Sequence, residues 1–500
     1  MNKSTRNLLL SKDRNQFEEY QNFLTRILNA KYAIENYEDY EEIYREKFAE
    51  AGPAKTVTFQ VTDDCNLKCT YCYQINKGKR KMSFETAKQF FDVLVKESYE
   101  EGSFVDLNKT PGLVVEFIGG EPLLEIDLID EISEYIKWKL ISENHTWANK
   151  FLFSMISNGV EYFDPKVQDY ITRNINRLSF GISLDGCKPL HDMCRVFPDG
   201  LGSYDIAEAG CIHYKENYDE KMLTKMTICP ENLTWTYEAF LNLIRLDYPV
   251  IHANCVYEKG WDVNHATTLY NQLKQIADFI LENDLENDLE FTMFDENLCK
   301  PQSLADNKNY CGSTGCMLCC DPDGNIAPCV RFLKSSLGED VGDFTIGHAN
   351  AGLGKLEIDK KNIETLDAVT RQSQSSKECM ECPISSGCGW CTAYNYQETG
   401  SVDKRCTYIC WPHRARALAN TYYWNKVHKK NNEPDRFRCY IQKDIALEII
   451  SEEEYNMLIE LADGQGEVPE DLLLDFVYSE SDLVQFTYKV KEYEDKEKGE

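Results

Sequence analysis

Three cysteines stand close together near residue 70, directly after an apolar, strand-like segment. Cys65, Cys69 and Cys72 are separated by three and then two residues, and the segment before them spans residues 56–62. A cubane iron–sulfur cluster has four irons and normally takes four thiolates, so three thiolates in one loop leave one iron open for chemistry. Structural zinc favours paired two-residue gaps and four closed ligands, which makes zinc the weaker interpretation.

This spacing, with an aromatic Tyr71 before the last cysteine, resembles the defining motif of the radical S-adenosylmethionine (SAM) superfamily. In that superfamily the open iron chelates the amino and carboxylate groups of SAM. Reductive cleavage of SAM then gives a 5′-deoxyadenosyl radical that abstracts a hydrogen atom. The resemblance implies that Tyr71 lies against the adenine. The non-enzymatic alternative is an iron–sulfur electron-transfer or scaffold protein, which needs no open iron.

A glycine-rich turn follows the second strand candidate. In Gly119-Gly120-Glu121-Pro122 the glycines let the backbone approach a ligand, and the carboxylate of Glu121 can accept a hydrogen bond from an ammonium group. Taken alone, such a tetrapeptide is an ordinary strand-to-helix turn. Beside the three-cysteine loop it resembles the superfamily motif that holds the methionyl amino group, and this implies the same role here.

Further polar residues stand where later strand candidates end. Ser157 and Asn158 follow the third, and Ser183 follows the fourth. Arg195 comes twelve residues after Ser183, which is the offset at which related enzymes place an arginine against the methionyl carboxylate. A planar guanidinium suits a carboxylate better than lysine does. The resemblance therefore implies that these four residues contribute to the SAM site.

The elements that position these residues alternate between apolar strand-like runs and amphipathic helical runs from residue 55 to about 291, which indicates an α/β fold with a parallel sheet. A helix is expected over 83–99 with Ser83 as its N-cap, and another over 265–289. Six units match the partial (β/α)6 barrel that the resemblance implies, with the cofactor at the carboxyl ends of the strands. The strand candidates are 57–61, 113–118, 151–157, 177–184, 222–228 and 250–256.

A second group of cysteines begins at residue 311 and resembles the SPASM extension of radical SAM enzymes, which binds two further cubane clusters. The resemblance assigns Cys311, Cys316, Cys329 and Cys391 to the first auxiliary cluster and Cys379, Cys382, Cys388 and Cys410 to the second. The chain departs from the pattern in two ways. Only two residues separate Cys388 from Cys391 where three are usual, and Cys319 and Cys320 are rival ligands beside Cys316.

The last ligand of the second set has two candidates, Cys406 and Cys410. Cys410 is preferred because the last cysteine of the family starts a helix, and the sequence from Trp411 onward has helical character. A treble-clef zinc site is the competing interpretation of this quartet, since paired cysteines also suit zinc. In total the resemblance implies SAM and three [4Fe-4S] clusters as cofactors.

Composition restricts the class of partner. The formal net charge is −30 at pH 7, which argues against a nucleic-acid or anionic-membrane surface because phosphate binding needs a basic footprint. Twenty-one cysteines without an evident export signal favour metal ligation in a reducing compartment, and we expect a cytoplasmic protein. The expected partners are a ribosomally made precursor peptide and an external one-electron reductant such as flavodoxin or ferredoxin.

The chain is expected to have four parts. Residues 1–54 form a polar helical segment that is too short for a complete leader-peptide domain, and 55–292 form the radical SAM partial barrel. Residues 293–425 form the SPASM domain, and 426–500 form an acidic helical end.

The expected function is thioether formation in a cysteine-rich peptide. SPASM enzymes mostly modify ribosomally made peptides, whereas sulfatase maturases of the group make formylglycine with an aspartate base directly after the cysteine equivalent to Cys329. Here that position is Val330, and Arg331 or another group would have to act instead. Carbon–carbon cross-linking, epimerisation and formylglycine formation are the enzymatic alternatives.

Overall fold

The computed structural model describes residues 54–464, apart from 219–221, 223, 298, 300–310, 314, 351–354, 372, 381 and 386. Nearly all of the helical segment expected over 1–54 lies outside the described residues, as does the acidic end beyond 464. No helix in the described part is long and apolar enough to span a membrane.

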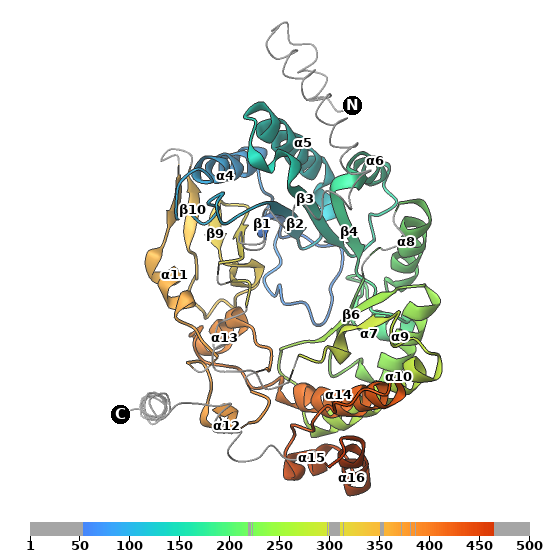
Figure 1. Cartoon of the computed structure of the whole chain (residues 1–500). Coiled ribbons are helices and arrows are strands. Elements are labelled where there is room, and N and C mark those ends of the chain that lie inside the picture. Colours follow the sequence, from blue (N-terminus) through green and yellow to red (C-terminus); the bar gives the residue numbers. More distant parts are fainter. Residues whose placement is uncertain are drawn as a thin grey trace, which may run out of the picture.

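Four parallel strands form the first half of an open barrel (Figure 1). They pair in chain order, with β1 beside β2, β2 beside β3 and β3 beside β4. Both faces of the first strand are buried, which explains its run of apolar residues. Aromatic side chains pack across the strands: the ring centres of Phe59 and Phe117 lie 5.9 Å apart, and those of Phe117 and Phe153 lie 5.8 Å apart. The strands are β1 (Lys55–Thr62), β2 (Leu113–Gly119), β3 (Phe151–Ser157) and β4 (Leu178–Ile182).

Three further parallel strands continue the barrel: β5 (Lys225–Ile228), β6 (Val250–Cys255) and β7 (Glu290–Phe291). A threonine links the two sheets, because the hydroxyl of Thr224 lies 3.2 Å from the carbonyl oxygen of Ile182 and 3.1 Å from that of Leu184. The six strand candidates are therefore all strands, and the α/β partial-barrel expectation is confirmed. The fourth and fifth are shorter than predicted.

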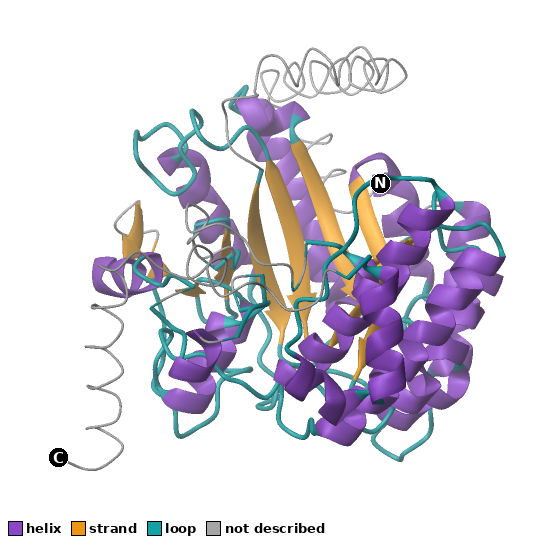
Figure 2. Cartoon of the chain, turned by 60° about the horizontal axis from the view of Figure 1, so that its bottom comes forward, coloured by secondary structure: helices purple, strands orange, loops and turns teal. Residues whose placement is uncertain are grey.

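Helices cover the outside of the strands (Figure 2). Ser83 caps α4 as expected, since its hydroxyl accepts a hydrogen bond from the amide of Thr86. The helix predicted over 265–289 is wrong at its end, because α10 stops at Glu282 and Asp284 adopts a left-handed conformation that ends a helix. The barrel helices are α4 (Phe84–Glu97), α5 (Ile126–Ser142), α6 (Pro165–Asn174), α7 (Lys188–Cys194), α8 (Tyr204–Asn217), α9 (Thr236–Arg245) and α10 (Val263–Glu282).

The cysteine-rich part shares the barrel's sheet. Strand β8 (Met317–Cys320) pairs in parallel with β1, and β9 (Asn325–Ala327), β10 (Gly347–Asn350) and β11 (Lys355–Ile358) add antiparallel strands at that edge. Backbone hydrogen bonds thus fix this part relative to β1.

Six helices complete the described chain. The longest, α14, packs along α10 (Figure 1), and residue 425, the predicted end of the SPASM domain, lies inside it. The helices are α11 (Lys360–Asp367), α12 (Lys377–Met380), α13 (Thr392–Thr399), α14 (Cys410–Lys430), α15 (Lys443–Ile449) and α16 (Glu452–Leu461). The predicted domain boundaries stay predictions.

Candidate active site

The loop that carries Cys65, Cys69 and Cys72 leaves the carboxyl end of β1 and enters the middle of the molecule (Figure 1). All three thiols are half-buried. Two backbone hydrogen bonds link the loop to the segment around Arg195, from the amide of Lys68 to the carbonyl of Val196 (2.7 Å) and from the amide of Thr70 to the carbonyl of Cys194 (3.0 Å). Burial raises the pKa of Cys65 and raises that of Cys69 to about 11. Bound metal would be needed to hold these thiols as thiolates near neutral pH.

The glycine turn after β2 lies directly on the start of this loop. The amide of Gly120 donates to the carbonyl of Thr62 (3.0 Å), and that of Glu121 donates to the carbonyl of Asp64 (2.8 Å). A Cβ atom on Gly120 would stand 2.3 Å from the Asp64 oxygen, and one on Gly119 would stand 2.7 Å from the Thr62 oxygen. The two glycines are therefore required by the close approach of two backbones.

The carboxylate of Glu121 binds two other predicted site residues directly and a third through one of them. It is 1% exposed and accepts hydrogen bonds from the Ser157 hydroxyl and the Asn158 amide, both at 2.8 Å. Asn158 in turn donates to the side-chain oxygen of Asn66 in the cysteine loop (2.7 Å). The amide of Ser183 donates to the Ser157 carbonyl (2.8 Å), so the ends of β3 and β4 meet here.

Burial raises the pKa of Glu121 to about 7. A positive charge beside a buried carboxylate favours its ionised form. The polar site at the strand ends, called the cradle below, is formed by Glu121, Ser157 and Asn158 together with Asp185 and Arg195. Its Glu121 carboxylate suits the ammonium of a bound amino acid, and the residues present fit the SAM site that the sequence predicts.

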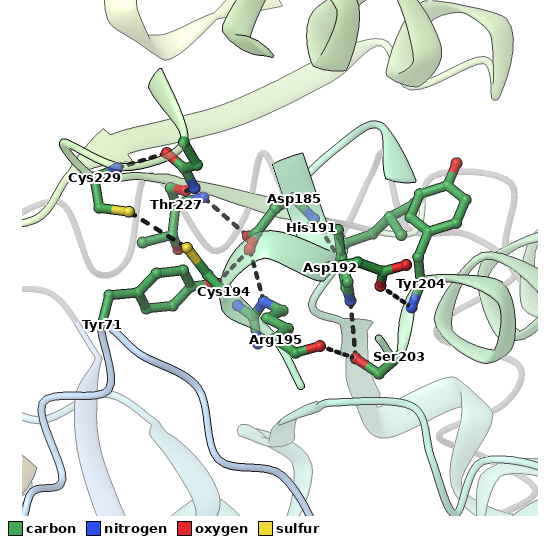
Figure 3. A network of polar contacts seen from close by, with 12 residues as sticks. Tyr71, Asp185, His191, Asp192, Cys194, Arg195, Ser203, Tyr204, Thr227 and Cys229 are labelled. Carbon is green, nitrogen blue, oxygen red and sulfur yellow. Dashed lines mark hydrogen bonds and ion pairs between the residues drawn. The ribbon is translucent and has the colours of Figure 1, made fainter. Parts of the chain in front are cut away.

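Arg195 and Tyr71 meet at a buried aspartate (Figure 3). Asp185 is fully buried, and one of its oxygens accepts hydrogen bonds from the Arg195 guanidinium (2.8 Å) and the Tyr71 hydroxyl, while the other accepts from the amide of Thr227 (3.0 Å). The Arg195 guanidinium also lies over the Tyr71 ring, 5.4 Å from its centre. Burial alone would lower the pKa of Arg195, but the ion pair with Asp185 and the other neighbouring groups raise it above its ordinary value.

Asp185 is a site residue that the sequence pattern did not predict, although it follows the predicted strand that ends at Leu184. A carboxylate at a strand tip, ten residues before a predicted cofactor arginine, was the available signal. Behind it, His191 accepts from the Asp185 amide (3.3 Å) and lies 3.0 Å from the Ser203 hydroxyl, which bonds the carbonyl of Arg195 (Figure 3). Burial lowers the pKa of His191 to about 4, so it is neutral and serves as a positioning group.

Four thiols of the predicted second auxiliary set face one cavity of about 260 Å³. Cys410 begins α14, and its thiol interacts with the other three thiols, which together with burial raise its pKa. Cys406 also borders the cavity, but its sulfur lies 3.8 Å from the carbonyl oxygen of Tyr394. The four thiols are Cys379, Cys382, Cys388 and Cys410.

The predicted first auxiliary set is gathered in part. Cys311, Cys329 and Cys391 interact with one another, and their mutual repulsion adds to burial in raising the pKa of Cys329. Cys316 is exposed at the start of β8 and interacts with the Lys55 ammonium.

The rival cysteines of that set, Cys319 and Cys320, lie inside β8 and are fully buried in the core. Within the described residues no three side chains of metal-ligating type converge on one ion position. The individual ligand assignments of both auxiliary sets stay predictions.

The chain is similar in sequence to an iron–sulfur family model and to proteins that include an uncharacterized protein and a maturation enzyme. A family model described as a 4Fe-4S single cluster domain matches residues 51–171. The chain is 31% identical over 149 residues to an uncharacterized protein of Methanocaldococcus jannaschii, covering 30% of this chain and 44% of that protein. It is 22% identical over 342 residues to the cysteine-type anaerobic sulfatase-maturating enzyme of Clostridium perfringens, covering 65% of this chain and 86% of the enzyme.

The fold agrees with these similarities. The solved structure of anSMEcpe with bound AdoMet superposes with a TM-score of 0.56 at 18% identity, covering 79% of this chain and 98% of that one. A further structure of that enzyme holds AdoMet and the Cp18Cys peptide, with a TM-score of 0.54 at 18% identity and coverage of 76% and 99%. In sequence and fold the chain is thus similar to the anaerobic sulfatase-maturating enzymes, and its residues 51–171 match a 4Fe-4S cluster domain.

Proposed function

We propose that this enzyme forms thioether cross-links between cysteine thiols and carbon atoms of a ribosomally made, cysteine-rich precursor peptide. Cys65, Cys69 and Cys72 would hold the SAM-binding cluster, and the two thiol sets after residue 310 would hold two auxiliary clusters. An external one-electron reductant such as flavodoxin or ferredoxin would be required. When bound, these groups supply the radical that takes a hydrogen atom from carbon and an acceptor for the electron released as sulfur bonds to that carbon.

One position carries the choice of reaction. Formylglycine formation in sulfatase maturases requires a base directly after the cysteine equivalent to Cys329, and Val330 there has no ionisable group. Arg331 follows, with its guanidinium 3.0 Å from the carboxylate of Glu258 and over the ring of Tyr73 at 4.7 Å. The Glu258 carboxylate is therefore held by Arg331. Carbon–hydrogen abstraction followed by sulfur–carbon bond formation fits this site better.

The chain's own groups would position the substrates of this reaction. Glu121 would bind the methionyl ammonium, and the Ser157 and Asn158 hydrogen bonds fix its carboxylate. Tyr71 and Arg195 share Asp185 and would form the wall against the adenine and the carboxylate of SAM.

Formylglycine formation is the second candidate function. The relative at 22% identity is a sulfatase-maturating enzyme, and a solved structure of anSMEcpe contains the Cp18Cys peptide. This function would require a base other than Val330.

Co-expression with a short, repeated-cysteine reading frame from the same genome, under anaerobic conditions, tests the proposal. Thioether formation predicts a loss of two hydrogens per cross-link by mass spectrometry, with the cysteines no longer alkylated by iodoacetamide. Conversion of a cysteine to formylglycine, or loss of hydrogens with every thiol still free, would overturn it. The reconstituted enzyme with a strong reductant and no peptide should release 5′-deoxyadenosine.

A further inference from the structure

The inner side of the barrel is open to solvent at β3. Leu152 and Ile156 are 38% and 54% exposed, whereas Phe153 and Met155, which alternate with them, are fully buried. Because successive side chains of a strand point to opposite faces, the exposed pair shares the face opposite the helices. Two apolar side chains left in water on the inside of a barrel indicate a space that another molecule fills.

Lys225 faces the same interior from β5. Met226 and Ile228 are fully buried on the outer face of this strand, so Lys225 and Thr227 lie on its inner face. The residue is exposed, yet burial is the largest cause that lowers the pKa of Lys225. A side chain that projects into an enclosed space filled with solvent is both accessible to water and surrounded by protein, which explains the exposure of Lys225 and the effect of burial on its pKa together.

Two arginines lie near the Lys225 ammonium, and each already has a carboxylate partner. Arg195 is paired with Asp185 at 2.8 Å, and Arg331 is paired with Glu258 at 3.0 Å. Both cations act with burial to lower the pKa of Lys225, and Asp185 opposes them.

No hydrogen bond or ion pair of Lys225 occurs among the described residues. In the described part of the chain, the Lys225 side chain on the inner face of β5 therefore has no carboxylate in direct contact.

The position of Lys225 indicates what it contacts. Arg195 belongs to the predicted SAM wall, and Arg331 stands two residues after Cys329 in the predicted first auxiliary set. A group near both lies between the two predicted cofactor sites, which is where a peptide must lie to react with one and pass an electron to the other.

We propose that Lys225 binds a carboxylate inside the barrel and that this carboxylate is an aspartate or glutamate side chain of the peptide substrate. The inference rests on the proposed function in that the substrate is a peptide. The exposed Leu152 and Ile156 would contact the apolar part of the same peptide, and Lys225 would fix its register by a charge-assisted hydrogen bond. The methionyl carboxylate of SAM could form the same hydrogen bond to Lys225. The experiment below distinguishes a carboxylate of the peptide from that of SAM.

The experiment uses the reconstituted enzyme, the Lys225→Met variant and the charge-retaining Lys225→Arg variant. A matched control is Lys166→Met, which removes the same charge from an exposed surface ion pair with Asp127. Each protein selects binders from a displayed library of short peptides that share one fixed cysteine, in the presence of SAM. The dissociation constant of SAM is measured separately by calorimetry.

We expect aspartate and glutamate to be enriched by wild type, Lys225→Arg and Lys166→Met, and not by Lys225→Met. Acidic peptides recovered with wild type should bind Lys225→Met about ten- to a hundredfold more weakly, and their amide versions should bind both proteins equally. A tenfold weaker SAM affinity in Lys225→Met with unchanged peptide selection would overturn the peptide assignment and give the carboxylate to SAM. The same selection and the same SAM affinity in all four proteins would overturn the proposal entirely.

The release of 5′-deoxyadenosine without peptide separates this inference from the proposed function. If Lys225→Met still releases 5′-deoxyadenosine at the wild-type rate and loses acidic selection, the inference stands on its own. If wild type releases none, the proposed function fails whatever the library shows.

Discussion

The cradle at the strand ends and the thiol-lined cavity beside α14 differ in what holds them together. In the cradle, polar side chains bond one another: Glu121 accepts from Ser157 and Asn158, and Asp185 accepts from Arg195. In the cavity, thiols face one another, and burial raises the pKa of Cys382 to about 11. The cradle can keep its shape without a ligand, whereas neutral thiols around a space of about 260 Å³ contribute few contacts of their own.

This difference separates two kinds of dependence on cofactors. Hydrogen bonds and a buried ion pair pre-organise the cradle, so SAM should bind with little rearrangement. Metal ligation would replace thiol protons with metal bonds in the thiol-rich part, and binding energy of that kind contributes to folding. Loss of a cradle residue should therefore affect ligand binding first, and loss of a cavity thiol should affect stability first.

The largest expected effect is in the three-cysteine loop. Cys65→Ala should lower 5′-deoxyadenosine formation by about a thousandfold or more, because the cluster that binds SAM is lost. Iron content should fall by about one third if three cubanes are present, and thermal stability should change little. Cys439→Ala, which removes a buried thiol outside all three sets, is the control. A complete loss of iron from Cys65→Ala would show that the three-cysteine loop and the thiols after residue 310 do not bind iron independently.

The cavity is tested by a pair of neighbouring cysteines. Cys410→Ala should lose about four irons per chain and lower the melting temperature, because Cys410 interacts with all three other thiols. Cys406→Ala should keep its iron, since the Cys406 sulfur lies 3.8 Å from the Tyr394 carbonyl oxygen. Iron analysis and thermal unfolding measure both effects. The opposite ranking would exchange the ligand assignment of the two cysteines.

The sequence predicted the strands because their apolar runs end in turn residues, and it predicted the cradle because Gly119-Gly120-Glu121 comes directly after a strand. The sequence did not predict contacts between residues that are distant along the chain. The pairing of β8 with β1 joins residues about 260 positions apart, and no local pattern indicates it. Asp185 was missed because its partners, Tyr71 and Arg195, are distant in sequence and meet only where strands of the barrel converge.

Asp185 sharpens the comparison, because its buried ion pair with Arg195 belongs to the cradle and not to the thiol-lined cavity. Asp185→Asn should raise the dissociation constant of SAM about tenfold and lower the free energy of unfolding by about 3 kcal/mol, since it leaves the Arg195 guanidinium buried beside a neutral amide. Calorimetry and denaturant unfolding measure the two effects. Asp205→Asn, at a side chain that is 79% exposed, is the control. An unchanged SAM affinity would show that Arg195 does not depend on this partner.

The smallest expected effect on SAM affinity concerns pH. Burial raises the pKa of Glu121 from its ordinary value of 4.5 to about 7, so the native state holds the proton more tightly than the unfolded state does. The stability from this group is complete below about pH 4.5 and is lost as pH rises toward 7, with a limit of about 3 kcal/mol.

A bound ammonium reverses this preference, because it favours the ionised carboxylate. SAM affinity should therefore rise several-fold between about pH 6 and pH 8 in wild type, and be flat and weaker in Glu121→Gln. Glu131→Gln, on the exposed side of α5, should follow wild type. If SAM affinity changed with pH in Glu121→Gln as it does in wild type, the titrating group would lie outside the cradle, among the thiols of the cluster loop.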